Sequence, residues 1–293
     1  MVLICSLISF FMITNEKHLL FILKVKKDRL NYILDHISDY YYSFEKPKID
    51  HITGLLRVNS HGLQEMRKLN APNDELKNIQ KRLYLFLKNN TVLPSYIFGG
   101  VKGKNNIRNA RFHQGNKYFF TTDLKSFFPS ITNKNVNDMF LREGCTPAIA
   151  RLLTKITTIN HELPQGTPTS TIIANLVFKP YGERLAEFAK TNNIKFSMFV
   201  DDITMSSSKD FKSLIPEILN IIKSSGFVIN QRKTHYRTKN PLVTGVICHN
   251  NRLLPPNIYK KKLARLKKEQ QNNFSAINKF RGLENYIESI AKA

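Results

Sequence analysis

The segment Ser197–Met205, SMFVDDITM, places two adjacent carboxylates, Asp201 and Asp202, inside an otherwise apolar run. Neighbouring carboxylates repel each other, and moving them from water into an apolar surrounding is costly. The flanking segments 194–200 and 203–207 have the composition of two short strands, so the pair is expected at the tip of a β-hairpin. Turn geometry alone is a common reason for aspartates at such a tip, because Asp tolerates it.

A third carboxylate, Asp123, ends another expected strand, KYFFTTD at 117–123. If this strand lies beside the hairpin, three carboxylates converge at one end of a sheet. Such a cluster needs cations, and hard oxygen ligands at this density suit Mg²⁺ bound together with substrate phosphates. Two such ions stabilise the attacking and leaving oxygens of an in-line phosphoryl displacement. These residues alone predict a magnesium-dependent phosphoryl-transfer enzyme and do not separate a polymerase from a nuclease.

The composition is that of a folded, strongly basic protein. A chain of 293 residues can bury a full core, as one large domain or as two to three subdomains. With 42% hydrophobic and 11% aromatic residues it is not a disordered chain. The 45 Lys and Arg residues against 22 Asp and Glu give a net charge of +23, which indicates a polyanionic partner, nucleic acid or an anionic membrane.

The cysteines and the N-terminus bear on the compartment. Three distant cysteines without a CxxC pair exclude a zinc framework and a disulfide scaffold, and they favour a reducing cytoplasm. The apolar run at 1–14 is too short to span a bilayer and lacks the flanks of a signal peptide. We therefore expect a buried N-terminal helix rather than a membrane anchor, although a start codon assigned at the wrong place is a further explanation.

Helices alternating with a few antiparallel strands indicate an α+β fold. A loop is expected over the polar, basic segment 99–115. Helices are expected over 15–45, from Asn73 onward, and over 135–158, about 167–190, 211–224 and 258–293. Strands are expected over 52–60, 63–72, 117–123, 194–200, 203–207, 227–230 and 243–249.

Four blocks in the right order resemble a reverse transcriptase, and more narrowly a retron reverse transcriptase, over roughly residues 60–290. They are TDLKSFFPSI (122–131), LPQGTPTSTIIANL (163–176), FVDD (199–202) and GFVINQRKT (226–234). Two further motifs are similar to retron signatures: Asn-Ala-x-x-His at 109–113 and Val-Thr-Gly at 243–245. The sequence departs from retron enzymes at Phe199-Val200, where they usually have Tyr-Ala. The change keeps the shape and removes a hydroxyl.

The resemblance implies a right-hand polymerase with fingers, a ferredoxin-like palm built on a small antiparallel sheet, and a short helical thumb. The expected boundaries are an N-terminal helical region at 1–45, fingers at 46–116, a palm at 117–250 and a thumb at 251–293. Within the palm range, helices at about 135–162 are expected to associate with the fingers.

The resemblance also implies catalytic roles. Asp123, Asp201 and Asp202 would bind two Mg²⁺ ions, with Asp202 the less essential of the adjacent pair. Leu124 is counted with them among the metal-binding positions. Phe128 would be the steric gate whose ring leaves no room for a ribose 2′-OH, although a core phenylalanine is the alternative.

Further positions are expected to bind the nucleotide together with the gate. Gln165 and Gly166 would contact the incoming nucleotide and the template, the glycine permitting close backbone approach. Arg67 and Lys68 would neutralise triphosphate charge, unless they are simply a solvated face. Lys233 would be the general acid for the pyrophosphate leaving group.

For RNA, Asn109 and His113 are expected to order a loop and contact the strand. The tail from Asn257 has the pattern of a basic amphipathic helix, which either lies on a membrane or, after a polymerase palm, grips RNA. The positions expected to bind phosphates there are Lys260, Lys261, Arg265, Lys267 and Lys268.

The resemblance implies that the protein uses dNTPs to copy part of a structured noncoding RNA of the msr–msd type. The product would be RNA-linked single-stranded DNA (msDNA), primed from a guanosine 2′-OH. It further implies antiphage defence with a separate effector protein, because no fused effector is expected in 293 residues. We expect a cytoplasmic protein without a membrane partner. The alternatives are another defence-associated or abortive-infection reverse transcriptase, a catalytically silent RNA-binding scaffold for an effector, and a protein anchored to a membrane by residues 1–14.

Overall fold

The computed structural model describes residues 13–49, 55–59, 61–249, 251–269 and 274–293. The chain divides into two compact units. The first comprises Met1–Lys46, Arg67–Pro94 and Ser126–Pro180, and the second comprises Pro47–Met66, Ser95–Lys125 and Tyr181–Ala293. Helices and antiparallel sheets are both present, which confirms the predicted α+β class.

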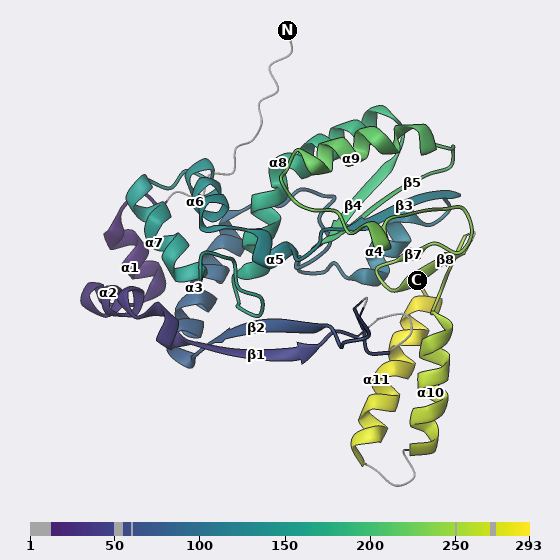
Figure 1. The fold of residues 1–293 in the computed structure, drawn as a ribbon, viewed down its shortest axis with the longest axis horizontal. Coiled ribbons are helices and arrows are strands. Elements are labelled where there is room, and N and C mark those ends of the chain that lie inside the picture. The colour runs from purple at the N-terminus through teal and green to yellow at the C-terminus, as the bar shows by residue number, and fades with distance from the viewer. Residues whose placement is uncertain (1–12, 50–54, 60, 250, 270–273) are drawn as a thin grey trace. The chain divides into compact units, whose positions relative to one another are not determined.

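The first unit is mainly helical (Figure 1). Its helices are α1 (Glu16–Leu23), α2 (Lys27–Asp35), the short 3-10 turn η1 (Ile37–Tyr40), α3 (Asp74–Asn90), α5 (Phe127–Ser130), α6 (Asn133–Arg142), α7 (Pro147–Thr157) and the first half of α8 (Ser170–Thr191). Two strands, β1 (Tyr41–Pro47) and β2 (Met66–Pro72), form a two-stranded sheet.

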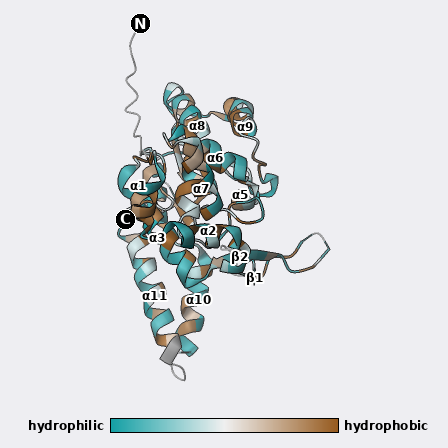
Figure 2. Ribbon diagram, turned by 90° about the vertical axis from the view of Figure 1, so that its left-hand side faces the viewer, coloured by the Kyte–Doolittle hydropathy of each residue, from teal (hydrophilic) through white to brown (hydrophobic). Residues whose placement is uncertain are grey.

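Helix α3 shows why these segments are helical. The Asn73 side chain accepts the backbone N–H of Leu76 at 3.0 Å, and acidic residues occupy the first turn, where the helix dipole favours negative charge. The buried residues are spaced for a single apolar face. They are Leu76, Ile79, Gln80, Leu83 and Leu87. The mixture of hydrophilic and hydrophobic residues along each helix is visible in Figure 2.

The second unit is built on a four-stranded antiparallel sheet in the order β4-β5-β3-β6. These strands are β3 (Tyr118–Asp123), β4 (Lys195–Phe199), β5 (Asp202–Ser207) and β6 (His235–Arg237). A three-stranded sheet follows, with β7 (Leu242–Val243), β8 (Val246–His249) and β9 (Arg252–Leu254). Besides the second half of α8, the helices are α4 (Asn106–His113), η2 (Lys212–Leu214), α9 (Ile215–Lys223), η3 (Gln231–Lys233), α10 (Asn257–Glu269) and α11 (Phe274–Ala291).

Helix α4 is fastened to both sheets of this unit. His113 is fully buried, and its two ring nitrogens lie 2.7 Å from the hydroxyls of Ser197 on β4 and Ser206 on β5. At the other end of the helix, Asn106 donates to the carbonyl of Thr244 at 3.0 Å and to the hydroxyl of Tyr286 on α11 at 2.6 Å. One short helix thus ties together the strands of the four-stranded sheet, the β7–β8 turn and the C-terminal helix.

Several predicted elements are confirmed, and three are wrong. Residues 15–45 are not helical throughout, because β1 begins at Tyr41. There, three aromatic residues, Tyr41, Tyr42 and Phe44, favour a strand. The predicted loop at 99–115 contains α4, which is capped by Asn105 and stabilised by buried contacts that a polar sequence does not reveal. The predicted strand at 227–230 is reduced to one bridge, Ile229 with Leu124, because the chain turns into η3.

Two predictions fall partly outside the described residues. The predicted strand at 52–60 shows isolated bridges at Leu56 and Val58, while 52–54 and 60 are not described. The apolar run at 1–14 is described only from Ile13, which is buried, so its assignment as a buried helix stays a prediction. In the parts of the chain covered by the structure, no helix has both the length and the apolar character that crossing a membrane would require.

Burial lowers the pKa of His113 to about 3, with the charge of Lys195 acting in the same direction. In the unfolded chain the His113 imidazole takes up a proton below about pH 6.5. In the folded protein the same imidazole stays neutral until about pH 3. The free energy of unfolding should therefore fall as the pH drops through this window, by up to about 1.4 kcal/mol per pH unit.

The variant His113→Asn cannot titrate and should lack this component, while being less stable than the parent protein near neutral pH. Urea unfolding of both proteins at a series of pH values measures it. Equal pH slopes for the two proteins would contradict the assignment.

Candidate active site

The backbone brings Asp123 and Asp202 opposite each other. The last residue of β3 is the antiparallel partner of the first residue of β5. Directly opposite residues in such a pair have Cα atoms about 4.5–5.5 Å apart. The prediction that the strand ending in Asp123 neighbours the hairpin is therefore confirmed. Asp201 lies in the two-residue turn that joins β4 to β5, since Phe199 pairs with Asp202.

The turn that carries Asp201 has an unusual backbone. Its first residue, Val200, has a φ of +60°, a left-handed conformation that is costly for a β-branched residue. Gly99 packs directly against it: a Cβ on Gly99 would lie 2.4 Å from the Val200 nitrogen. Only a glycine allows the chain to approach this closely.

The segment around Gly99 is held against β4 by backbone hydrogen bonds. The Phe98 N–H donates to the Met198 carbonyl at 2.8 Å, and the Met198 N–H donates to the Tyr96 carbonyl at 2.9 Å. The Lys104 ammonium closes the loop by donating to the carbonyls of Ser95 and Ile97 at 2.6 and 2.7 Å. The turn is thus supported from outside the hairpin that contains it.

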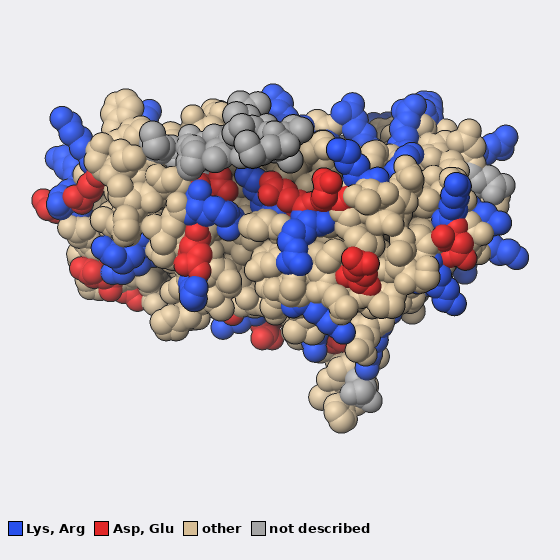
Figure 3. Space-filling view, turned by 90° about the horizontal axis from the view of Figure 1, so that it is seen from above, with Lys and Arg blue, Asp and Glu red and all other residues tan. Residues whose placement is uncertain are grey.

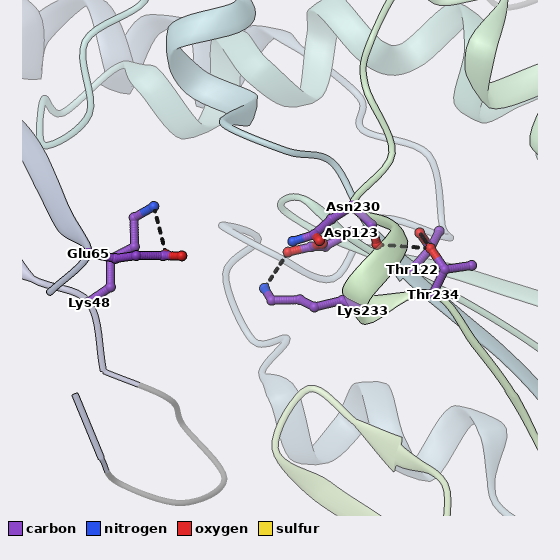
Figure 4. A network of polar contacts seen from close by, with 7 residues as sticks. All are labelled: Lys48, Glu65, Thr122, Asp123, Asn230, Lys233 and Thr234. Atoms are coloured by element: carbon purple, nitrogen blue, oxygen red, sulfur yellow. Dashed lines mark hydrogen bonds and ion pairs between the residues drawn. The ribbon is translucent and has the colours of Figure 1, made fainter. Parts of the chain in front are cut away.

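The segment 226–234 lies along the end of β3 (Figure 4). The Lys125 N–H donates to the Val228 carbonyl at 2.7 Å, and the Asn230 N–H donates to the Asp123 carbonyl at 2.9 Å. The 3-10 turn η3 then directs the Lys233 ammonium onto the Asp123 carboxylate, with which it forms an ion pair.

The same edge is closed by two further bonds. The hydroxyls of Thr122 and Thr234 are 2.8 Å apart, and the Leu124 N–H donates to the Asp201 carbonyl at 3.0 Å. The side chain of Leu124 is buried. Leu124 therefore contacts the aspartate turn through its backbone.

Burial raises the pKa of Asp202 to about 7, and repulsion by Asp201 and Asp123 adds to this, while the charge of Lys233 partly opposes it. Asp123 is 4% exposed. One of its carboxylate oxygens accepts from Lys233, and the other, Oδ1, is buried without a hydrogen-bond partner. A buried carboxylate oxygen without a partner beside a second, destabilised carboxylate is an arrangement that a cation would stabilise.

The chemical type of these side chains suits a divalent cation. Asp123 and Asp202, with Asp201 adjacent, would hold it through hard oxygen ligands. Within the described part of the chain, however, no three His, Cys, Asp or Glu side chains already stand close enough to form a ligand set. In this arrangement the ammonium of Lys233 is the cation bound to Asp123.

The residues predicted to bind the nucleotide lie in the first unit, apart from Lys233. Gly166 has a φ of +112°, and the neighbouring Gln165 carbonyl accepts the N–H of Asn70 at 3.0 Å, so this turn packs on the end of β2. Arg67 and Lys68 are exposed on the same strand.

Phe128 is partly buried on α5, with its ring centroid 5.9 Å from that of Phe127. The structure thus brings Gln165 and Gly166 next to the strand that carries Arg67 and Lys68. The binding roles of these four residues and of Phe128 stay predictions.

The residues predicted to bind RNA divide into two groups. Asn109 is 1% exposed and donates to the Thr244 hydroxyl at 3.3 Å, and His113 is fully buried. In this arrangement neither side chain is accessible to a nucleic acid. On α10, by contrast, the predicted side chains are all exposed; they are Lys260, Lys261, Arg265, Lys267 and Lys268.

The roles of Gly99 and Asn106 were not predicted from the sequence. The Gly99-Gly100 pair indicates only a turn, and nothing in the sequence shows which strand a glycine approaches. Asn106 precedes the Asn-Ala-x-x-His motif and resembles the other polar residues of its segment.

The chain matches the family model described as reverse transcriptase (RNA-dependent DNA polymerase) over residues 28–272. It therefore belongs to the reverse transcriptase family, which implies a right-hand polymerase fold.

Its relatives include retron enzymes. The chain is 30% identical over 210 residues to the retron Se72 reverse transcriptase of Salmonella heidelberg, covering 71% of this chain and 52% of that protein. It is 30% identical over 174 residues to the retron Ec86 reverse transcriptase of Escherichia coli, covering 58% and 54%. To the Escherichia coli retron Ec83 reverse transcriptase it is 28% identical over 249 residues, covering 78% and 80%. The match spans about half the length of the first two relatives. The predicted resemblance to retron reverse transcriptases is confirmed.

The support of the aspartate turn can be tested by stability. Gly99→Ala should destabilise the protein by about 1–3 kcal/mol, because the new methyl group meets the backbone of Val200. Gly282→Ala in α11 is the matched control, since a Cβ there has no neighbour within 4 Å and alanine favours a helix by up to about 1 kcal/mol. Chemical unfolding of both variants gives the comparison. A Gly99→Ala variant as stable as the parent protein would show that the chain does not approach Val200 this closely.

Proposed function

We propose that the protein is an RNA-directed DNA polymerase whose chemistry takes place at Asp123, Asp201 and Asp202. The observation that carries this proposal is the cross-strand pairing of Asp123 with Asp202, in a chain that belongs to the reverse transcriptase family. Bound Mg²⁺, as two ions, would neutralise phosphate charge and stabilise the attacking and leaving oxygens.

The protein's own groups would orient and select the nucleotide. The ammonium of Lys233, which forms an ion pair with Asp123, would neutralise phosphate charge and donate a proton to the leaving pyrophosphate. Arg67 and Lys68 would contact the triphosphate.

The template and the sugar would be selected by the first unit. Gln165 and Gly166 would lie against the template and the incoming nucleotide. Phe128 would exclude a ribose 2′-OH. In this proposal the four-stranded sheet is the palm, α10 and α11 form the thumb, and the first unit supplies most of the fingers.

We further infer that the substrate is a structured noncoding RNA of the retron type, copied into RNA-linked single-stranded DNA from a guanosine 2′-OH. The relatives named above are retron reverse transcriptases. The two retron-like motifs also contact each other, since the Asn109 side chain donates to the Thr244 hydroxyl. A cytoplasmic role in antiphage defence, with a separate effector protein, is part of the same proposal.

The carboxylates are tested by Asp123→Asn and Asp201→Asn, each nearly isosteric with the parent residue. Each should lower dNTP incorporation on an RNA template by at least about 100-fold, because each removes several kcal/mol of charge stabilisation from the transition state. Asp138→Asn on α6, an exposed aspartate paired with Lys134, is the control and should keep full activity. Unchanged incorporation by Asp201→Asn would refute the metal assignment.

The steric gate is tested by Phe128→Ala. Removing the ring should raise the incorporation of ribonucleotides relative to deoxynucleotides by about 10-fold or more, since a clash with the 2′-OH disappears. Single-nucleotide extension with rNTP and dNTP measures the ratio. Phe21→Ala, which changes a 79% exposed ring on α1, should leave it unaltered.

A further inference from the structure

The four-stranded sheet has ends of opposite charge. β3 runs from Tyr118, paired with Ser207, to Asp123, paired with Asp202. At about 3.4 Å per residue these ends are roughly 17 Å apart. The carboxylates lie at one end. At the other, Lys117 precedes β3 and donates its N–H to the Ser207 carbonyl at 3.2 Å.

A hollow of about 460 Å³ opens at this second end. We call this site the basic hollow. Its polar lining consists chiefly of Asn116, Lys117, Lys239, Asn240 and His249. No carboxylate is among the described residues that line it. Neither Lys117 nor Lys239 forms an ion pair with any carboxylate in the described chain, and both are exposed. The hollow therefore presents positive charge that no ion pair within those residues neutralises.

Hydrogen bonds within the second unit fix the residues that line the hollow. The Asn116 amide donates to the Ser206 hydroxyl at 2.7 Å, and the Cys248 N–H donates to the Pro241 carbonyl at 2.9 Å. Asn240, with a φ of +48°, turns the chain back toward β8, and its side chain lies 2.5 Å from the His249 ring. The start of β3, the end of β8 and the segment that joins β6 to β7 thus form the site.

The neighbouring carboxylate, Asp210, lies outside the lining of the hollow. The hydrogen bond from Tyr236 is the largest cause that lowers its pKa, and the charge of Lys117 is one of the smaller causes. Asp210 accepts from the Tyr236 hydroxyl at 2.6 Å and from the Lys212 N–H at 2.9 Å. Basic residues also predominate over acidic ones across the face shown in Figure 3, in keeping with the net charge of +23. A polyanion attracted by this net charge would find at the basic hollow a concave place with two ammonium groups outside any ion pair of the described chain.

We propose that the basic hollow binds phosphate groups of an RNA backbone. Ammonium and amide donors are the groups that contact phosphate oxygens without reading sequence. Because the hollow is roughly 17 Å from the carboxylates along β3, the RNA segment held there differs from the segment being copied. The site would retain the structured RNA while synthesis proceeds, and in this respect it rests on the proposed function.

The test is the double variant Lys117→Ala/Lys239→Ala in the full chain, with a fluorescently labelled RNA hairpin as the probe and no nucleotides present. Affinity at about 0.1 M salt should fall on the order of 10-fold, and the slope of log affinity against log salt should shrink by about two, roughly one for each phosphate that the variant no longer binds. Lys117→Arg/Lys239→Arg should restore both.

The matched control is Lys81→Ala/Lys88→Ala, which removes the same charge from exposed positions on α3. It should change affinity less than the hollow variant does. Equal losses in the two variants would mean that only net charge matters, and unchanged binding by the hollow variant would mean that no RNA lies there; either result overturns the proposal.

Incorporation of dNTPs on a short primer–template separates this inference from the proposed function. The hollow variant should retain it, because Asp123 is untouched. Loss of incorporation with full hairpin affinity would overturn the inference. RNA binding is measured without nucleotides, so the binding assay can be repeated in an Asp123→Asn background, where no synthesis is expected. A parent protein that incorporates no dNTP would refute the proposed function, while the binding assay would still test the hollow.

Discussion

Two carboxylates held opposite each other at the end of an antiparallel strand pair impose the main constraint on this protein. Asp123 and Asp202 are cross-strand partners, and burial, together with repulsion by Asp201 and Asp123, raises the pKa of Asp202 to about 7. The Lys233 ammonium compensates in part by pairing with Asp123, while a buried Asp123 oxygen stays without a hydrogen-bond partner. A raised pKa means that a proton, or a cation in its place, stabilises the pair, and a metal ion with substrate phosphates is what a reverse transcriptase would bind there.

The geometry of the pair depends on backbone contacts more than on side chains. The turn that carries Asp201 contains a left-handed Val200, and the chain passes so close at Gly99 that no side chain fits between them. On the other side, the segment 226–234 hydrogen-bonds along the end of β3. These supports explain how a strained turn keeps one conformation, because the surrounding structure determines it from both sides.

The two retron-like motifs have a structural role in this chain. Asn109 and His113 are buried, and they fasten α4 to the β4–β5 hairpin and to the β7–β8 turn. A histidine with both ring nitrogens bonded inside a core stays neutral, and it positions the strands that end at the aspartates. The same sheet then presents carboxylates at one end and exposed lysines at the other, which would let the protein hold one RNA at two places.

The family and the positions of most strands could be predicted from the amino-acid sequence alone. Aspartates between two short strand patterns, a third at the end of another strand, and four ordered blocks were enough to predict an α+β fold, a reverse transcriptase and the cross-strand meeting of Asp123 with the hairpin. Tertiary contacts were needed to learn that 99–115 contains a helix, that Lys233 pairs with Asp123, that Gly99 supports Val200, and that His113 is buried. Each of these depends on residues far apart in the chain, and hydrophobic periodicity reports only on near neighbours.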